Sequence, residues 1–181
     1  QGQVDAYRDA HQWKDATAVA AEAAKALPNE HGIQLMYAGQ LADTGQVAEG
    51  LALAKAQITE KSSTSDQRDA HLALAQIYTR LKRFPEAAKE LDSASALATK
   101  PEEKLYVALL RGALADKQKN YDEAEAQFGK ALMIDPQNAT ILNYFGYMLA
   151  DRGVRLPEAL TMIQKAVDLD PQNGAYLDSL G

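Results

Sequence analysis

The side chains best suited to acid–base catalysis or metal binding in this chain are its three histidines, His11, His31 and His71. No two of them lie three or four residues apart, the spacing that would place two imidazoles on one helix face as metal ligands. The chain has no cysteine, which excludes disulfides, thiolate catalysis and thiolate metal sites. We therefore predict no metal or cofactor site, and we expect His71 to be a packed or half-buried imidazole rather than a ligand or base.

Acidic residues recur in a short phrase that consists of an apolar or aromatic residue, a spacer, an acid and a small residue. Its five copies are Trp13–Ala16, Val47–Gly50, Phe84–Ala87, Tyr121–Ala124 and Leu156–Ala159, and their last residues are spaced by 34, 37, 37 and 35 positions. The helix dipole stabilises an acid in the first turn of a helix, so these acids are predicted to mark helix starts. They are not expected to form a catalytic carboxylate pair.

Other signatures of catalysis and of nucleic-acid binding are missing from the sequence. It contains no glycine-rich phosphate loop, no HExxH metal motif and no nucleophile elbow, so we predict that the chain is not an enzyme. Its 25 acids outnumber its 19 lysines and arginines, and the densest basic cluster is only Arg80, Lys82 and Arg83. Nucleic-acid binding usually needs a basic stripe, so we predict no nucleic-acid partner. No stretch approaches the roughly 20 apolar residues that span a bilayer, so no membrane span is predicted.

The period of 34 to 37 residues is typical of stacked helical arrays. Alternating β-branched runs, which would indicate strands, do not occur, and the chain is rich in alanine, the best helix former. We therefore predict an all-α protein in which each repeat contains two antiparallel helices. These helices are called A and B below, and the repeated phrase is expected to begin helix B.

The last complete repeat carries the fullest pattern. Its apolar, small and turn positions are Leu142, Phe145, Gly146, Leu149, Ala159, Ile163 and Pro171. This spacing resembles the tetratricopeptide repeat, W-x2-L-G-x2-Y…A-x3-F…P, with Leu142 at the tryptophan position. The resemblance implies a right-handed superhelical solenoid of antiparallel helix pairs.

The same register divides the chain into a single array. The predicted boundaries are a partial repeat at about 1–30, complete repeats at 31–64, 68–101, 105–138 and 139–173, and the start of a further repeat at 174–181. In that last segment, Leu177 and Leu180 are in register with Leu142 and Phe145. Because the array begins and ends inside repeats, we expect the chain to be a fragment of a longer protein.

Small residues are predicted to let helices A and B approach closely. These positions are Ala38, Ala75, Gly112 and Gly146 in helix A and Ala124 and Ala159 in helix B. Pro136 and Pro171 follow helix B and prevent its continuation. Capping-box spacing indicates helix starts at Thr64–Gln67 and Thr99–Glu102, and Asn138 is expected to be a helix cap.

The resemblance also implies where a partner binds. In the tetratricopeptide-repeat family, the inner faces of the A helices line a concave groove that typically takes peptide segments of other proteins. By register, the predicted groove residues are Leu35, Met36, Leu72, Gln76, Tyr106, Leu109, Asn143, Tyr144 and Tyr147. Some members grip a peptide's terminal carboxylate with basic residues, but the corresponding positions here are Leu35, Leu72, Thr140 and Tyr144. We therefore expect a hydrophobic peptide or an amphipathic helix as the partner.

Three functions remain open at this point. The first is a non-enzymatic scaffold that binds a protein or peptide in the concave groove. The second is a structural module that forms homo-oligomers through exposed repeat ends, and the third is the regulatory region of a larger enzyme or sensor. Tyr144 and Tyr147 are expected either to contact a partner or to pack between neighbouring repeats. Tyr147–Arg152 and Leu177–Gly181 resemble repeats of bacterial cell-envelope proteins. The compartment stays open between the cytoplasm and the periplasm or cell envelope.

Overall fold

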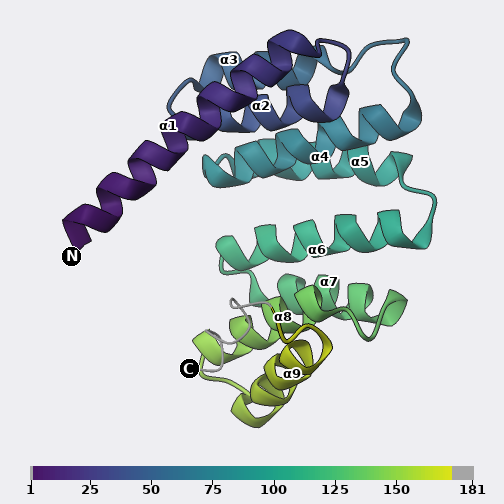
Figure 1. The fold of residues 1–181 in the computed structure, drawn as a ribbon. Helices are drawn as coiled ribbons and strands as arrows, with labels where there is room; N and C mark the ends of the chain where they lie inside the picture. Colours follow the sequence, from purple (N-terminus) through teal and green to yellow (C-terminus); the bar gives the residue numbers. More distant parts are fainter. Residues whose placement is uncertain (1, 173–181) are drawn as a thin grey trace. The chain divides into compact units, whose positions relative to one another are not determined.

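The computed structural model describes the backbone of residues 2–172 and the side chains of residues 14–172, and its regular elements there are all α-helices (Figure 1). They are α1 (Gly2–Ala26), α2 (His31–Asp43), α3 (Val47–Ala56), α4 (Thr64–Arg80), α5 (Phe84–Leu97), α6 (Pro101–Lys117), α7 (Tyr121–Ile134), α8 (Ala139–Asp151) and α9 (Leu156–Leu169). None of these helices combines the length and apolar composition needed to cross a bilayer. The predicted all-α class is confirmed. The predicted restart of the repeat at 174–181 and the side chains of His11 and Trp13 lie outside the described residues.

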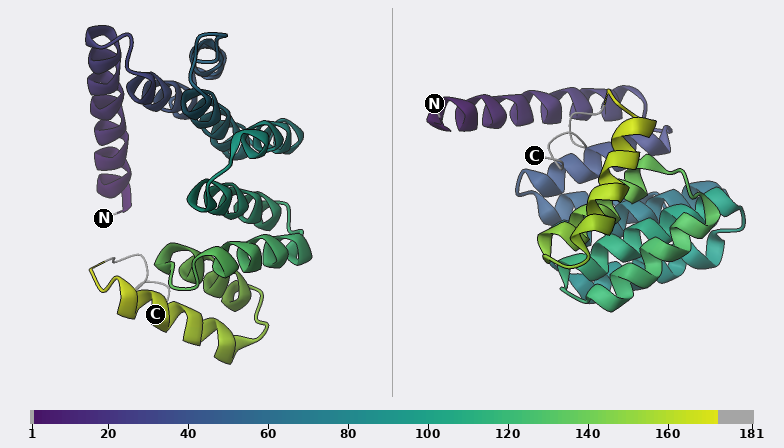
Figure 2. Two further views of the ribbon diagram at one scale, coloured as in Figure 1. Left: turned by 90° about the vertical axis from the view of Figure 1, so that its right-hand side faces the viewer. Right: turned by 90° about the horizontal axis from the view of Figure 1, so that it is seen from below.

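The helices fall into two compact units, Gln1–Leu97 and Ala98–Gly181, which we call unit 1 and unit 2. In unit 1, α2 packs against α3 and α4 against α5, while α1 lies on α2. In unit 2, the corresponding pairs are α6 with α7 and α8 with α9 (Figures 1 and 2). Successive pairs stack within each unit, as α4 does on α2 and α3. Each unit is therefore a solenoid of A–B pairs in which α2, α4, α6 and α8 are the A helices.

The turn from helix A to helix B has the same geometry in four places. The chain enters the left-handed region at Gly45 (φ 95°), Lys82 (φ 59°), Lys119 (φ 59°) and Gly153 (φ 68°). The N–H of the next residue then donates to the carbonyl five residues back, as Arg83 does to Tyr78 at 2.8 Å. This is the Schellman arrangement, which satisfies carbonyls at a helix C-terminus. Local hydrogen bonding thus reverses the chain in each repeat.

The first copy of the repeated phrase does not begin a helix, contrary to the prediction. Trp13–Ala16 lies inside α1, which runs unbroken from Gly2 to Ala26, whereas the other four copies begin α3, α5, α7 and α9. The residue that would enter the left-handed region is His11, two positions before Trp13. A reversal there would place a non-glycine residue in the left-handed region and would interrupt the run of helical hydrogen bonds in α1. Asp15 is therefore a mid-helix residue rather than a helix-start acid.

Two helix starts are shifted by one residue from the prediction. Ser63 rather than Thr64 caps α4, and its Oγ accepts from the N–H of Asp66 at 3.0 Å. Serine at this position is itself a favourable cap, so the helix begins one residue earlier than predicted. Lys100 precedes α6 because Pro101 takes the first helical position, and the carboxylate of Glu103 accepts from the Lys100 N–H at 3.2 Å.

The predicted cap at the start of α8 is confirmed. Oδ1 of Asn138 accepts from the N–H of Ile141 at 3.1 Å. This contact satisfies one of the backbone donors that the first turn of a helix leaves without an intrahelical partner.

Small residues stand where helices A and B approach most closely, as predicted. A Cβ at Gly112 would lie 2.6 Å from Cε1 of Phe128, and one at Gly146 would lie 2.9 Å from a backbone oxygen of α9. In unit 1, the equivalent positions are held by Ala38 and Ala75, and both are buried. Since larger side chains would force the pair apart, these positions set the distance between the helices.

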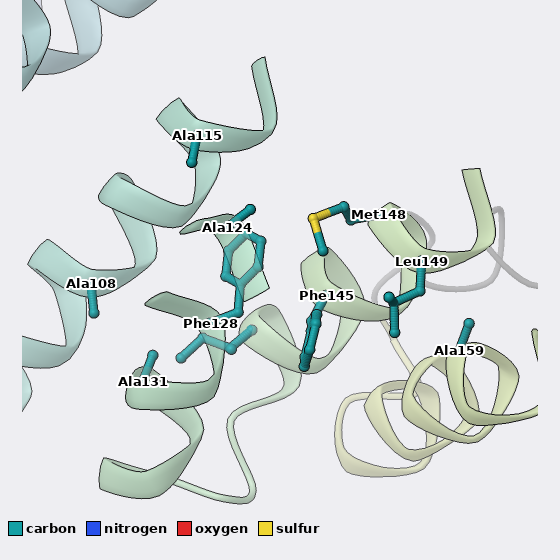
Figure 3. Packing of buried hydrophobic residues seen from close by; sticks show 10 residues of the cluster. Ala108, Ala115, Ala124, Phe128, Ala131, Phe145, Met148, Leu149 and Ala159 are labelled. Atoms are coloured by element: carbon teal, nitrogen blue, oxygen red, sulfur yellow. The ribbon is translucent and has the colours of Figure 1, made fainter. Parts of the chain in front are cut away.

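The core of unit 2 consists of alanines and a few large apolar side chains around two phenylalanines (Figure 3). Phe128 of α7 and Phe145 of α8 have ring centroids 5.8 Å apart. The remaining members of this cluster are Ala108, Ala115, Ala124, Ala131, Ile141, Met148, Leu149 and Ala159. These side chains point between the helices, so the inner faces of α6 and α8 carry a different set of residues.

Candidate functional site

The A helices of unit 1, α2 and α4, pack together and leave an open groove of about 270 Å³. Residues three or four positions apart on a helix share one face, and the lining residues follow this spacing. They are Leu35, Met36, Gly39, Gln40, Asp43, Ala73, Gln76, Ile77 and Arg80. We call this site the α2–α4 groove. It has an apolar end towards the start of both helices and a polar end towards their C-termini.

An arginine–aspartate pair closes the polar end of the α2–α4 groove. Nε of Arg80 donates to Oδ1 of Asp43 at 2.8 Å, which links α4 to α2. The guanidinium lies beside Gly39, where an added Cβ would be in ordinary van der Waals contact with Nη2 of Arg80 at 3.4 Å. Oε1 of Gln40 accepts from the hydroxyl of Thr17 in α1 at 3.5 Å. The polar end is therefore built by three helices of unit 1.

Three of the four predicted groove residues in unit 1 line the α2–α4 groove. Leu35 is partly buried, Met36 is 52% exposed, and Gln76 faces the groove from α4. Leu72 is only 7% exposed and belongs to the core instead. Helix register places Leu72 one turn before Gln76, but register alone does not show which positions neighbouring helices cover.

The repeat register did not assign Asp43 or Gln40 to the groove. A signal for Asp43 was present, because Asp43 and Arg80 have opposite charges and lie 37 positions apart, one repeat period. Equivalent positions of adjacent repeats are neighbours in a stacked array, so opposite charges at this spacing predict an ion pair. No comparable signal marks Gln40.

The predicted residues of unit 2 lie on α6 and α8. Tyr106, Tyr144 and Tyr147 expose 40%, 50% and 56% of their surface, respectively. Leu109 is partly buried and packs against the unit 2 core. The ring of Tyr144 stacks near that of Phe128, with centroids 6.4 Å apart and an interplanar angle of 21°. Tyr144 thus packs within its unit and still presents half of its surface to solvent.

Two polar features accompany these tyrosines in unit 2. Oδ1 of Asn143 is buried and has no hydrogen-bond partner among the described residues. Burial raises the pKa of the Asp116 carboxyl, the charge of Asp151 raises it further, and Lys117 and Arg152 oppose the shift. The structure thus leaves one buried oxygen of α8 without a partner among the described residues and partly desolvates one carboxyl of α6.

The two histidines whose side chains are described pair with carboxylates across helices. Nδ1 of His71 lies 2.6 Å from Oε2 of Glu90, and this imidazole is 19% exposed, as the repeat register predicts. Nε2 of His31 lies 3.5 Å from Oδ2 of Asp66. Among the described residues, no group of three or more histidines and acids could hold a metal ion.

Two family sequence models match this chain. One tetratricopeptide-repeat model matches residues 41–101, and another tetratricopeptide-repeat model matches residues 106–138. Together they cover about half of the chain, in both units. The chain belongs to the tetratricopeptide-repeat family. The repeat pattern therefore identifies the family, and the helix pairs described above are tetratricopeptide repeats.

Solved structures share the tetratricopeptide-repeat fold of this chain. TTC0263, a thermophilic tetratricopeptide-repeat protein of Thermus thermophilus, is 21% identical, with 98% of this chain and 94% of its own covered and a TM-score of 0.67. YrrB, a tetratricopeptide-repeat protein with an unusual peptide-binding site, is 18% identical, with 97% and 87% covered and a TM-score of 0.58. MamA is 20% identical, with 93% and 94% covered and a TM-score of 0.56. At these identities the comparison shows the fold alone, and no curated protein matches in sequence.

Proposed function

We propose that this tetratricopeptide-repeat protein is a non-enzymatic scaffold that binds a peptide or protein segment on the inner faces of its A helices. The α2–α4 groove carries the proposal, because it is open to solvent and combines an apolar end with a few polar groups. Concave sites of this composition are typical of ligand binding. YrrB, a protein of similar fold, has a peptide-binding site, which supports the same proposal.

The predicted groove residues divide into two contact areas under this proposal. In unit 1, Leu35 and Met36 contact apolar side chains of the partner, and Gln76 supplies a polar contact. Methionine suits this role because its flexible side chain adapts to different partners. In unit 2, the second contact area consists of Tyr106, Leu109, Asn143, Tyr144 and Tyr147. Tyrosine offers a large rigid surface with a polar tip, as is common at binding surfaces.

A displayed peptide library, selected against the full chain, tests the proposal. Peptides that bind are measured on Met36→Asp in unit 1 and Tyr147→Ala in unit 2. A charge buried against the partner without a counter-charge should weaken binding of unit 1 ligands about tenfold or more. Because Met36 is 52% exposed, its substitution should leave the folded structure intact.

Met133→Asp is the matched control, since Met133 is 85% exposed but lies on the B helix α7. It introduces the same charge away from the inner faces and should leave peptide affinity unchanged. Selected peptides that bind Met36→Asp and Tyr147→Ala as tightly as the unmodified chain would rule out the proposed faces.

Self-association is the second candidate, favoured by the apolar face of α9. Leu156 and Leu160 lie one turn apart and are 48% and 51% exposed. In the preceding repeat, the equivalent residues Tyr121 and Glu125 are contacted by Arg152, which lies 4.3 Å from the tyrosine ring centroid and 3.2 Å from the carboxylate. Sedimentation over a range of concentrations tests this candidate, and Leu160→Asp should abolish any concentration-dependent increase in mass.

A further inference from the structure

We infer that the α2–α4 groove selects segments in which an apolar side chain lies three residues from an aspartate or glutamate, whose carboxylate binds Arg80. The inference rests on the proposed function and names the chemistry of the partner. Three observations carry it: the arrangement of the Arg80–Asp43 pair, the hydrogen-bonding groups at the polar end, and the length of the groove.

The Arg80 guanidinium is held in place while part of it stays accessible. Arginine has five N–H donors in a planar fork. Asp43 accepts from Nε, which leaves the Nη groups for a second acceptor. The Arg80 side chain is 45% exposed, whereas that of Asp43 is 23% exposed, so the arginine is the more accessible partner. Arginine forks bind carboxylates through two parallel hydrogen bonds, and an arginine already fixed by one acid loses less side-chain entropy on binding another.

The remaining groups at the polar end also favour an acceptor in the partner. Oε1 of Gln40 accepts from Thr17, so the amide N–H groups of Gln40 are left as donors towards the groove. Asp43 and Arg80 are the only charged residues among those that line the groove. A lysine of a partner would compete with Arg80 for the less exposed Asp43, whereas a carboxylate would meet donors from both Arg80 and Gln40.

The length of the groove sets the spacing in the partner. Met36 at the apolar end and Asp43 at the polar end are seven residues apart in α2, about 10 Å at 1.5 Å per residue. A segment in the polyproline II conformation has three residues per turn and rises about 3.1 Å per residue, so side chains three positions apart share one face and lie about 9 Å apart. When an apolar side chain of the partner lies beside Leu35 and Met36, the side chain three positions before or after it, depending on the direction in which the segment runs, lies next to Arg80.

A library of end-capped nine-residue peptides tests the inference without interference from terminal charges. Each peptide carries a leucine and, three positions before or after it, either aspartate, asparagine or lysine in otherwise identical sequences. The unmodified chain should retain the aspartate peptides about tenfold better than their asparagine counterparts. Arg80→Gln should abolish this preference while leaving the asparagine peptides bound as before.

Arg83→Gln is the matched control, because it removes the same charge from a residue that pairs with Glu86 at 2.6 Å and does not line the groove. It should keep the preference for aspartate. Equal retention of aspartate and asparagine peptides, or a preference that persists in Arg80→Gln, would overturn the inference. If Met36→Asp still abolished binding in that case, the proposed function would stand. Preferred binding of the lysine peptides would also overturn the inference. If the unmodified chain retained no peptide, or if Met36→Asp retained the peptides equally well, both the inference and the proposed role of the α2–α4 groove in binding would be overturned.

Discussion

Unit 1 and unit 2 use the same repeat but present different inner faces. Both contain A–B pairs joined by a left-handed turn residue and held close by small side chains. On the inner face, unit 1 has a groove that ends in the Arg80–Asp43 ion pair, whereas unit 2 exposes Tyr106, Tyr144 and Tyr147. The buried positions thus maintain the fold, and the exposed positions of the A helices are free to differ. Variation on this face leaves the fold of a unit unchanged, and under the proposed function it changes what the unit binds.

The largest expected effect comes from removing the large buried side chain of helix B in each unit. Phe128→Ala in α7 should destabilise unit 2 by about 3–5 kcal/mol, and Leu91→Ala in α5 should destabilise unit 1 by about 2–5 kcal/mol. Both side chains are 1% exposed, so each substitution leaves a cavity. Amide hydrogen exchange, resolved by helix, should show faster exchange mainly in the unit that carries the substitution. Equal acceleration in both units would contradict the view that each has a core of its own.

The glycines of unit 2 provide a sharper test of the contact between helices A and B. Gly146→Ala should lower the free energy of unfolding, because its Cβ would meet a backbone oxygen of α9 at 2.9 Å. The steric penalty is about 1–3 kcal/mol, against a gain in helix propensity of about 1 kcal/mol. Gly129→Ala in α7 is the control, since nothing lies within 4 Å of its added Cβ. It should raise stability by about 0.5–1 kcal/mol in denaturant unfolding, and a loss of stability there would contradict this account.

The turns between helices A and B differ in residue type but share one conformation. Lys82→Gly in unit 1 and Lys119→Gly in unit 2 should each stabilise the protein by about 1 kcal/mol, because glycine adopts a positive φ without the Cβ penalty. Gly45→Ala should have the opposite sign. Thermal unfolding of the three variants measures the effect, with Lys89→Gly inside α5 as a control that should be destabilising. If both lysine-to-glycine variants in the turns were less stable than the parent, the assigned turn geometry would be wrong.

The smallest expected effect concerns pH and a partly buried carboxyl of unit 2. The pKa of Asp116 is raised above its ordinary value of 3.8 by burial and by Asp151. Its contribution to stability is therefore fully present below the unfolded pKa and is lost as pH rises through the folded pKa. Asp116→Asn should be more stable than the parent at neutral pH, and the difference should vanish as pH falls below 3.8. Asp151→Asn should change the same melting-temperature profile in the same direction but less, because burial is the larger cause.

The candidate site was predictable only in part. The register of the repeat brought Leu35, Met36 and Gln76 to one groove, since positions that share a helix face follow from spacing alone. It also assigned Leu72 to that face, where packing buries it. The Arg80–Asp43 pair joins residues 37 positions apart, and its geometry depends on how α2 and α4 stack. Which residues are buried and which pair over long distances depends on the neighbouring helices, so the residue pattern of a single helix does not predict either.

By itself, the sequence determined the family, the all-α class and the close-packed positions of the A–B pairs. These follow from local rules: a 34-to-37-residue period, helical spacing of three and four, and small residues at contacts that leave no room for larger ones. The tertiary structure alone decided that Lys82 and Lys119 take the left-handed conformation that Gly45 and Gly153 adopt elsewhere. A lysine does not favour that conformation locally, and it is held there because the packed helices on either side require the chain to reverse.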